Sequence, residues 1–184
     1  LSVRSFRLAH PANANAFAPL TTRTDEPPSM HLSTHNWMRA EPIEVTLRRI
    51  SRLGFESIEI CVEPLLYEPK VCRPLLKKYG IRCWGAVTLT LGERNLAASD
   101  PAQRAATVEY MKSVVTMVKE LEGHEITIVP ATVGKVVPDS TPELEWKWVV
   151  AGLQEVYSYA EQCGVRVALE PLNRFETYFL NRWN

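Results

Sequence analysis

Residues 141–170 read TPELEWKWVVAGLQEVYSYAEQCGVRVALE, a stretch in which one predicted helix leads directly into one predicted strand. Thr141 is a good helix N-cap, and Pro142 suits the first helical position. Apolar side chains then recur at helical spacing along one face: Val149, Leu153, Val156, Ala160 and Cys163. Gly164 is suited to end the helix, and the apolar run at 165–170 predicts a strand. This unit decides the fold class because the same order recurs upstream.

Four earlier strands are predicted by short apolar runs at 30–34, 57–61, 81–87 and 125–129. Helical patterns separate them. These helices are predicted to begin at Pro42, near Pro74 and at Asp100-Pro101, and two of them to end at Gly54 and Gly80.

Strands that alternate with helices predict parallel βαβ units, either in a barrel or in a doubly wound sheet. No Gly-x-Gly-x-x-Gly motif follows the first strand, which disfavours dinucleotide binding. A complete (β/α)₈ barrel needs roughly 250 residues. We therefore predict an α/β fold, an incomplete (β/α)₈ TIM barrel with about five βα units.

Composition excludes several classes of protein. The chain has 21 Lys and Arg against 21 Asp and Glu, so it lacks the basic excess of a nucleic-acid binder. No apolar run approaches the ~20 residues that span a membrane. The four cysteines are Cys61, Cys72, Cys83 and Cys163. They form no Cys-x-x-Cys pair, which predicts reduced thiols and a cytoplasmic protein.

Residues 1–29 show no sustained hydrophobic period and are rich in Ala, Pro, Thr and Asn. They resemble a transit peptide only faintly, and a disordered or non-native extension before Met30 is the preferred interpretation. The barrel domain is therefore predicted to occupy residues 30–184.

The candidate site lies beyond the carboxyl ends of the strands, where parallel α/β folds place their chemistry. Glu170 is the most informative residue there, because it ends an apolar strand where an unpaired carboxylate is costly to bury. A metal ion would remove that cost, and so would an ion pair with Arg174. The residues alone leave these two alternatives evenly open. For His35, after the first strand, they favour a hydrogen-bonded loop histidine over a ligand or a substrate contact.

Residues 167–181, Val-Ala-Leu-Glu-Pro-Leu-Asn-Arg-Phe-Glu-Thr-Tyr-Phe-Leu-Asn, closely resemble the fifth-strand signature of the ketose 3-epimerases of the D-tagatose and D-psicose type. These enzymes belong to the xylose isomerase-like barrels. Residues 53–60 are similar to their second-strand region, and residues 94–101 to their third loop. The resemblance covers about residues 30–182.

The resemblance implies a metal-dependent sugar epimerase that acts on D-ketoses through a cis-enediolate. It implies that Glu170 binds a divalent metal, Mn²⁺ before Mg²⁺ or Co²⁺, and serves as one acid/base. It implies that Glu176 contacts sugar hydroxyls, and we take His35, Arg174 and Thr88 as further candidate substrate contacts. Metal stabilisation of the developing enediolate charge makes such proton transfer physically reasonable.

The remaining metal ligands of the family, an Asp, a His and a second Glu, come from strands six to eight. The sequence stops at Asn184, before those strands, so we expect this chain to be inactive alone and its exposed edges to favour a homo-oligomer. Three alternatives stay open: a hydroxypyruvate isomerase or inosose dehydratase activity, an endonuclease IV type of activity, or a non-catalytic half-barrel that binds partners.

Overall fold

The computed structural model describes residues 30–37, 39, 41–63 and 66–181. The extension predicted at residues 1–29 lies outside the described residues. The chain divides into two units, Leu1–Met30 and His31–Asn184, and every described helix and strand belongs to the second.

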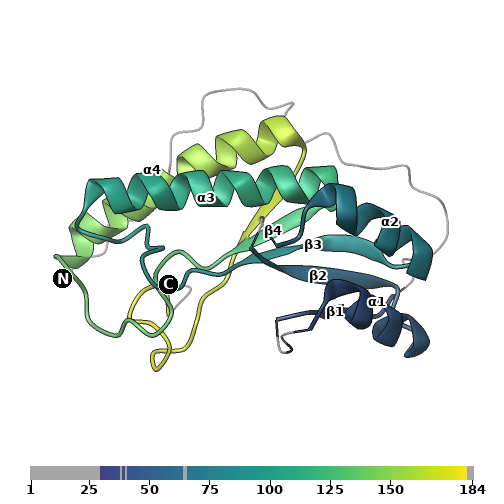
Figure 1. The fold of residues 1–184 in the computed structure, drawn as a ribbon. Helices are drawn as coiled ribbons and strands as arrows, with labels where there is room; N and C mark the ends of the chain where they lie inside the picture. Colours follow the sequence, from purple (N-terminus) through teal and green to yellow (C-terminus); the bar gives the residue numbers. More distant parts are fainter. Residues whose placement is uncertain (1–29, 38, 40, 64–65, 182–184) are drawn as a thin grey trace. The chain divides into compact units, whose positions relative to one another are not determined.

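Five strands alternate with four helices along the described chain (Figure 1). In order they are β1 (Ser33–His35), α1 (Ile43–Arg52), β2 (Ser57–Val62), α2 (Pro69–Tyr79), β3 (Arg82–Thr88), α3 (Pro101–Glu120), β4 (Glu125–Ile128), α4 (Pro142–Cys163) and β5 (Arg166–Leu169).

The strands form one sheet in the order β1-β2-β3-β4-β5, and each neighbouring pair is parallel. Sequential parallel strands joined by helices are the arrangement of a (β/α)₈ barrel rather than of a doubly wound sheet, whose strand order reverses at a switch point. The predicted fold class, five βα units of an α/β barrel, is confirmed.

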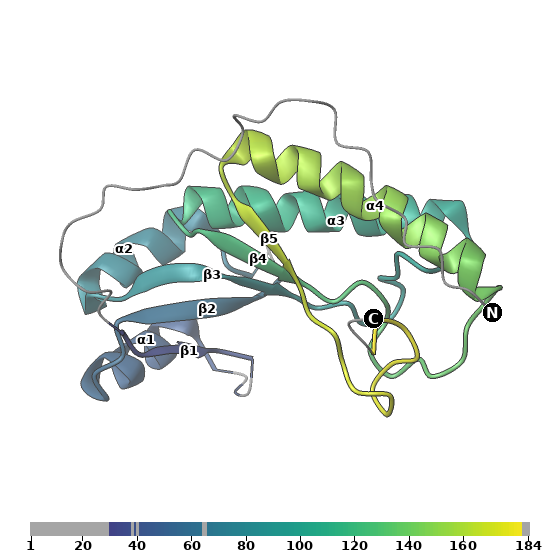
Figure 2. The same ribbon diagram turned by 180° about the vertical axis from the view of Figure 1, so that it is seen from behind.

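Helices cover one face of the sheet, and Figure 2 shows α3 and α4 lying side by side over it. The strand side chains beneath them are apolar and fully buried: Ile58, Ile60, Ala86, Ile126 and Ile128. Helix α3 contributes Met111, Val114, Val115 and Val118, the stripe expected from its spacing. The opposite face of the sheet is only partly covered and carries polar groups.

Helix ends follow the sequence signals. Asp100 accepts a hydrogen bond from the Ala102 amide at 2.9 Å, and the Thr141 side chain accepts one from the Leu144 amide. Gly164 ends α4 in the left-handed conformation, with a φ of 71°. These contacts satisfy backbone groups that a helix end leaves unpaired.

The starts of two elements differ from the prediction by three residues or more. Strand β1 covers Ser33–His35 rather than residues 30–34, because its pairing with β2 begins only at Ser57. Helix α2 begins at Pro69 rather than near Pro74. Pro69 occupies the first turn, where a missing N–H costs nothing, and the exposed helix accepts Pro74 at the loss of one backbone hydrogen bond.

No helix in the described part of the chain is long and apolar enough to cross a membrane.

Candidate active site

The loops that follow the strands gather at one end of the sheet (Figure 1). The loops after β4 and β5 lie side by side there, joined by backbone hydrogen bonds from Gly134 N to Glu176 O at 2.6 Å and from Tyr178 N to Lys135 O at 3.1 Å. The candidate residues at the ends of β1, β3 and β5 therefore belong to one edge of the sheet.

Glu170 directly follows β5 and is partly exposed. Its amide donates to the carbonyl of Ile128 at 2.9 Å, which extends the β4–β5 ladder by one residue. No ion pair joins Glu170 to Arg174 or to any other basic side chain of the described residues. The ion-pair alternative for Glu170 is therefore not realised, and the carboxylate is available to a ligand.

Glu176 lies six residues further on, in the loop after β5, with its side chain exposed. The Asn173 side-chain amide donates to Glu176 Oε2 at 2.5 Å, and Asn173 Oδ1 accepts from the Phe175 amide at 2.9 Å. Asn181 closes the loop by donating to the carbonyls of Leu172 and Thr177 at 2.8 and 2.9 Å. The Asn-Arg-Phe-Glu segment is thus an ordered turn.

Arg174 is exposed on this loop and lines a cavity of about 340 Å³ with Val136, Tyr178 and Asn181. Its guanidinium makes no ion pair within the described residues. The structure therefore places Arg174 on the Glu176 loop as an exposed cation.

His35 ends β1, and the register places it opposite Glu59 of β2. Its ring stacks on Trp37 with centroids 5.1 Å apart, while its Nδ1 atom is buried with no hydrogen-bond partner in the described part of the chain. The sequence favoured a hydrogen-bonded loop histidine, and the structure leaves this nitrogen without that bond. Such an unsatisfied buried nitrogen is unusual in folded proteins.

Glu59 belongs to a polar row that the sequence alone could not define, because the face of a strand residue depends on register. The row runs across the less covered face of the sheet through His35, Glu59, Gly85, Glu125 and Arg166. Burial raises the pKa of Glu59, and the Glu125 and Glu170 carboxylates raise it further against the opposing effect of His35. Glu170 and Glu59 therefore interact electrostatically on this face.

Thr88 ends β3 and is buried, with 2% of its surface exposed. Its hydroxyl accepts a hydrogen bond from the Val129 amide at 3.1 Å and contacts the Thr90 hydroxyl at 3.4 Å. The structure thus uses Thr88 to join the ends of β3 and β4.

Glu63 and Arg94 join the loops after β2 and β3. Two hydrogen bonds of 2.6 and 2.8 Å link the guanidinium to the carboxylate, and a third of 3.0 Å runs to the Leu89 carbonyl. The Arg94 guanidinium carbon also lies 3.7 Å from the centroid of the Tyr110 ring. Arg94 is therefore fully engaged within the protein.

The described residues do not form a complete site for a divalent cation, because they contain no group of three His, Cys, Asp or Glu side chains that could hold a metal ion. The carboxylate of Glu170 is of the right chemistry for Mn²⁺ or Mg²⁺, which prefer oxygen ligands. Glu170 alone supplies one metal ligand, and the remaining ligands of a metal site would have to come from other residues.

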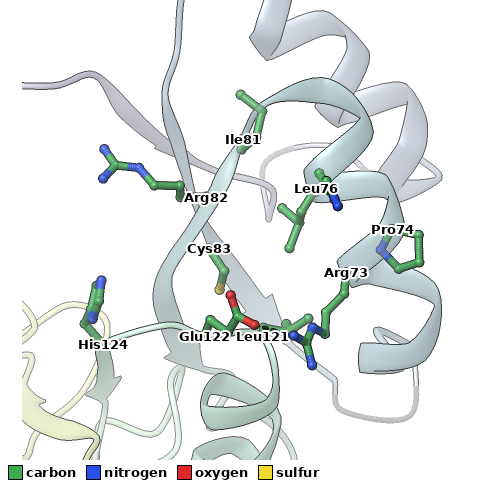
Figure 3. A pocket seen from close by; sticks show the side chains of 10 residues that line it. Arg73, Pro74, Leu76, Ile81, Arg82, Cys83, Leu121, Glu122 and His124 are labelled. Atoms are coloured by element: carbon green, nitrogen blue, oxygen red, sulfur yellow. Dashed lines mark hydrogen bonds and ion pairs between the residues drawn. The ribbon is translucent and has the colours of Figure 1, made fainter.

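A separate cavity lies away from these residues, at the opposite end of the sheet. It measures about 650 Å³ and lies between α2, the start of β3 and the turn before β4. Figure 3 shows Arg73 reaching toward Glu122, with which it forms an ion pair, beside an apolar floor that includes Leu76. Because catalytic groups in such barrels lie at the carboxyl ends of the strands, this cavity is not part of the candidate site.

Residues 47–184 match the family model of the xylose isomerase-like TIM barrel. The chain belongs to this family. Five parallel strands in sequential order, joined by helices, are the arrangement expected of part of such a barrel.

Several curated relatives of this xylose isomerase-like chain are 3-epimerases. The chain is 29% identical over 145 residues to D-psicose 3-epimerase of Ruminiclostridium cellulolyticum, a match that covers 73% of this chain and 48% of the relative. It is also 29% identical over 145 residues to fructoselysine 3-epimerase of Shigella flexneri, covering 74% of this chain and 51% of the relative. The chain thus spans about half the length of the curated relatives it matches.

A solved structure of D-allulose 3-epimerase from Methylomonas sp. in complex with D-allulose shares the fold. Its TM-score is 0.75 at 24% identity, and the match covers 85% of this chain and 56% of that one. D-Psicose 3-epimerase with D-tagatose from Clostridium cellulolyticum gives 0.73 at 23% identity, covering 83% and 56%.

Proposed function

We propose that this chain contributes to a ketose 3-epimerase, in which Glu170 moves the proton at C3 of a D-ketose and Glu176 holds the sugar. The observation that carries the proposal is the placement of Glu170: it follows β5 at the carboxyl edge of the sheet, and no basic side chain of the described residues pairs with it. The similarity to 3-epimerases supports the same conclusion.

The chemistry asks for a carboxylate that can accept a proton from carbon beside a carbonyl. Glu170 is a partly exposed carboxylate at the carboxyl edge of the sheet, and no basic side chain of the described residues pairs with it. A carboxylate held within hydrogen-bonding reach of such a proton can accept it as a general base. The second carboxylate, on the other face of the sugar, would come from beyond the described residues.

The metal remains part of the proposal. We propose that Glu170 is one ligand of a divalent cation, Mn²⁺ before Mg²⁺ or Co²⁺, with the other ligands supplied by further strands. When bound, such a cation would stabilise negative charge on the oxygens of an enediolate. His35, at the end of β1, and Arg174, on the Glu176 loop, are proposed sugar contacts. We leave Thr88 out, because its buried hydroxyl is already bonded to the β4 end.

A phosphodiester substrate of the endonuclease IV type is less well supported. Two basic residues at the carboxyl edge are neutralised: Arg94 by Glu63, and Lys135 by Asp139 at 2.5 Å. Arg174 stays unpaired among the described residues, but binding a nucleic-acid backbone takes several free cations. We therefore favour a neutral sugar over DNA.

We also propose a reducing compartment such as the cytoplasm, and self-association. The four cysteines all lie within the described residues and form no disulfide, and burial raises the pKa of Cys83 to about 12, so that thiol is unreactive. Strand β5 is an edge of the sheet formed by the described residues, and 40% of the Leu169 surface is exposed there. An apolar edge strand favours pairing, either with a further strand of the barrel or with another chain.

The test is Mn²⁺-dependent C3 epimerisation of D-fructose, D-psicose and D-tagatose. It would be run on this chain and on a version completed with the C-terminal half of the R. cellulolyticum enzyme. We expect activity only in the completed version. Activity in neither would reject the epimerase proposal and favour a binding role. Activity in the short chain would show that the described residues suffice, against our account of the metal ligands.

A further inference from the structure

The loop that carries Glu176 is fastened to helix α4 by two neighbouring pairs of side chains. Glu145, in the first turn of α4, accepts a hydrogen bond from the Tyr178 hydroxyl at 2.6 Å. The next residue, Trp146, stacks on Phe179 with ring centroids 5.9 Å apart and an angle of 28°. We call these four residues the α4 clip.

Glu145 is a carboxylate with no exposed surface. Its Oε1 atom accepts hydrogen bonds from the backbone amides of Asp139 and Ser140 at 2.7 and 2.9 Å. These two donors belong to the loop that leads into α4, whereas Tyr178 comes from the loop after β5. Burying a charged group is costly unless donors surround it, so the carboxylate holds both loops together.

The clip lies close to Glu176 along the chain. Tyr178 is two residues beyond Glu176, and the backbone of this segment is bonded to the β4 loop at Gly134 and Lys135. The Glu176 carboxylate itself remains exposed, with the Asn173 amide as its partner. The protein thus fixes the backbone around Glu176 while leaving its carboxylate accessible.

We propose that Glu145 is a positioning residue of the sugar site: through Tyr178 it holds residues 173–179 so that Glu176 is already in place when a sugar arrives. This inference rests on the proposed role of Glu176. A loop that is ordered beforehand spares the entropy that binding would otherwise cost, so the clip increases affinity without touching the sugar.

If Glu145 served only to cap the start of α4, removing the Tyr178 hydroxyl would leave the Glu176 loop as ordered as in the parent. Tyr178→Phe removes only a hydroxyl and leaves both backbone donors on Glu145. It would therefore loosen the Glu176 loop without disturbing the start of the helix. Glu143→Gln, an exposed change in the same helical turn, is the matched control.

The first experiment is hydrogen–deuterium exchange on the whole chain. In Tyr178→Phe and Glu145→Ala we expect amides of residues 173–179 to exchange about tenfold faster or more, as the loss of a charge-assisted hydrogen bond implies, with β2–β4 unchanged. The double variant should exchange no faster than Glu145→Ala, and Glu143→Gln should match the parent. If Glu145→Ala fails to fold, Tyr178→Phe alone decides. Unchanged loop exchange in Tyr178→Phe, or an equal rise in the strands, would overturn the proposal.

The second experiment measures D-psicose kinetics in the version completed with the C-terminal half of the R. cellulolyticum enzyme. Tyr178→Phe should raise KM about tenfold and leave kcat within about twofold, the pattern of lost binding rather than lost chemistry. An unchanged KM would overturn the positioning role. Absence of epimerisation in every variant would reject the proposed function, while the exchange experiment would still decide whether Glu145 holds the loop.

Discussion

A Cβ atom on Gly85 would overlap the backbone carbonyl oxygen of Glu125, its register partner on the neighbouring strand. Gly85 stands between Glu59 and Glu125 in the polar row, and only a residue without a side chain allows β3 and β4 to approach this closely. The glycine is therefore needed where the sheet carries its charged groups.

Gly85→Ala should lower the free energy of unfolding by about 2 to 3 kcal/mol, because the clash is with backbone and cannot be relieved by rotating a side chain. The measurement is urea unfolding of the whole chain. Gly152→Ala is the matched control: the atoms nearest to its Cβ would belong to side chains, Leu96 at 3.0 Å and Val108 at 3.4 Å, and alanine favours the helix. Equal losses in the two variants would contradict the backbone explanation.

Glu59→Gln should stabilise the fold at neutral pH. The pKa of Glu59 is raised in the folded state above its ordinary value of 4.5, so the folded protein binds this proton more tightly than the unfolded chain does. The favourable contribution of Glu59 is then fully present below pH 4.5 and is lost as pH rises through its folded pKa.

The measurement for Glu59→Gln is the urea midpoint across a pH range of about 4 to 8, which starts near the ordinary value and extends in the direction of the shift. The gain over the parent should be largest near neutrality and shrink in acid. The exposed change Glu93→Gln should show no such trend. A gain that is constant with pH would mean that packing, and not ionisation, separates the two proteins.

The sequence predicted the order of strands and helices because the strands are short apolar runs and the helices repeat apolar residues at helical spacing. Val149, Val156 and Ala160 are buried as their spacing required. Where local signals conflict, prediction failed: Pro74 indicates a helix start, yet Pro69 provides a better one five residues earlier. The start of β1 depends on its pairing with β2. The partner residues are distant in sequence, so the residues around Ser33 do not reveal where the pairing begins.

The candidate site was predictable where it follows from strand ends, as for Glu170. It was not predictable where it depends on register, as for Glu59, or on a distant partner. The burial of Glu145 could have been predicted from the sequence, because Glu145 lies four residues before Val149, on the same face as the buried stripe of α4. A carboxylate on an apolar stripe indicates a buried partner, but only the fold identifies Tyr178 as that partner.

The Glu63–Arg94 pair should stabilise the two loops by a modest amount. The side chains are 35% and 29% exposed, so solvent screens part of their attraction. We expect a coupling energy of about 1 kcal/mol in a double-mutant cycle of Glu63→Gln and Arg94→Met, measured by urea unfolding. Arg94→Lys should lose most of it, since lysine cannot make the two parallel bonds. Arg52→Lys, an exposed change at the end of α1, is the control. A coupling energy of zero would show that the Glu63–Arg94 pair is a surface contact that does not stabilise the fold.

In the version completed with the C-terminal half of the R. cellulolyticum enzyme, substituting Glu170 should mainly affect the chemical step, and substituting Glu176 should mainly affect sugar binding. Glu170→Gln removes the proposed base, so kcat and C3 deuterium incorporation from D₂O should fall by about 10² to 10⁴. Glu176→Gln keeps a hydrogen-bonding group of the same shape, and the expected effect is about a tenfold rise in KM with a smaller change in kcat. Both are followed by NMR of D-psicose with Mn²⁺, beside Glu161→Gln, an exposed change in the last turn of α4. If Glu170→Gln exchanges the C3 proton as fast as Glu161→Gln, proton transfer at C3 must be assigned to a residue outside this strand end.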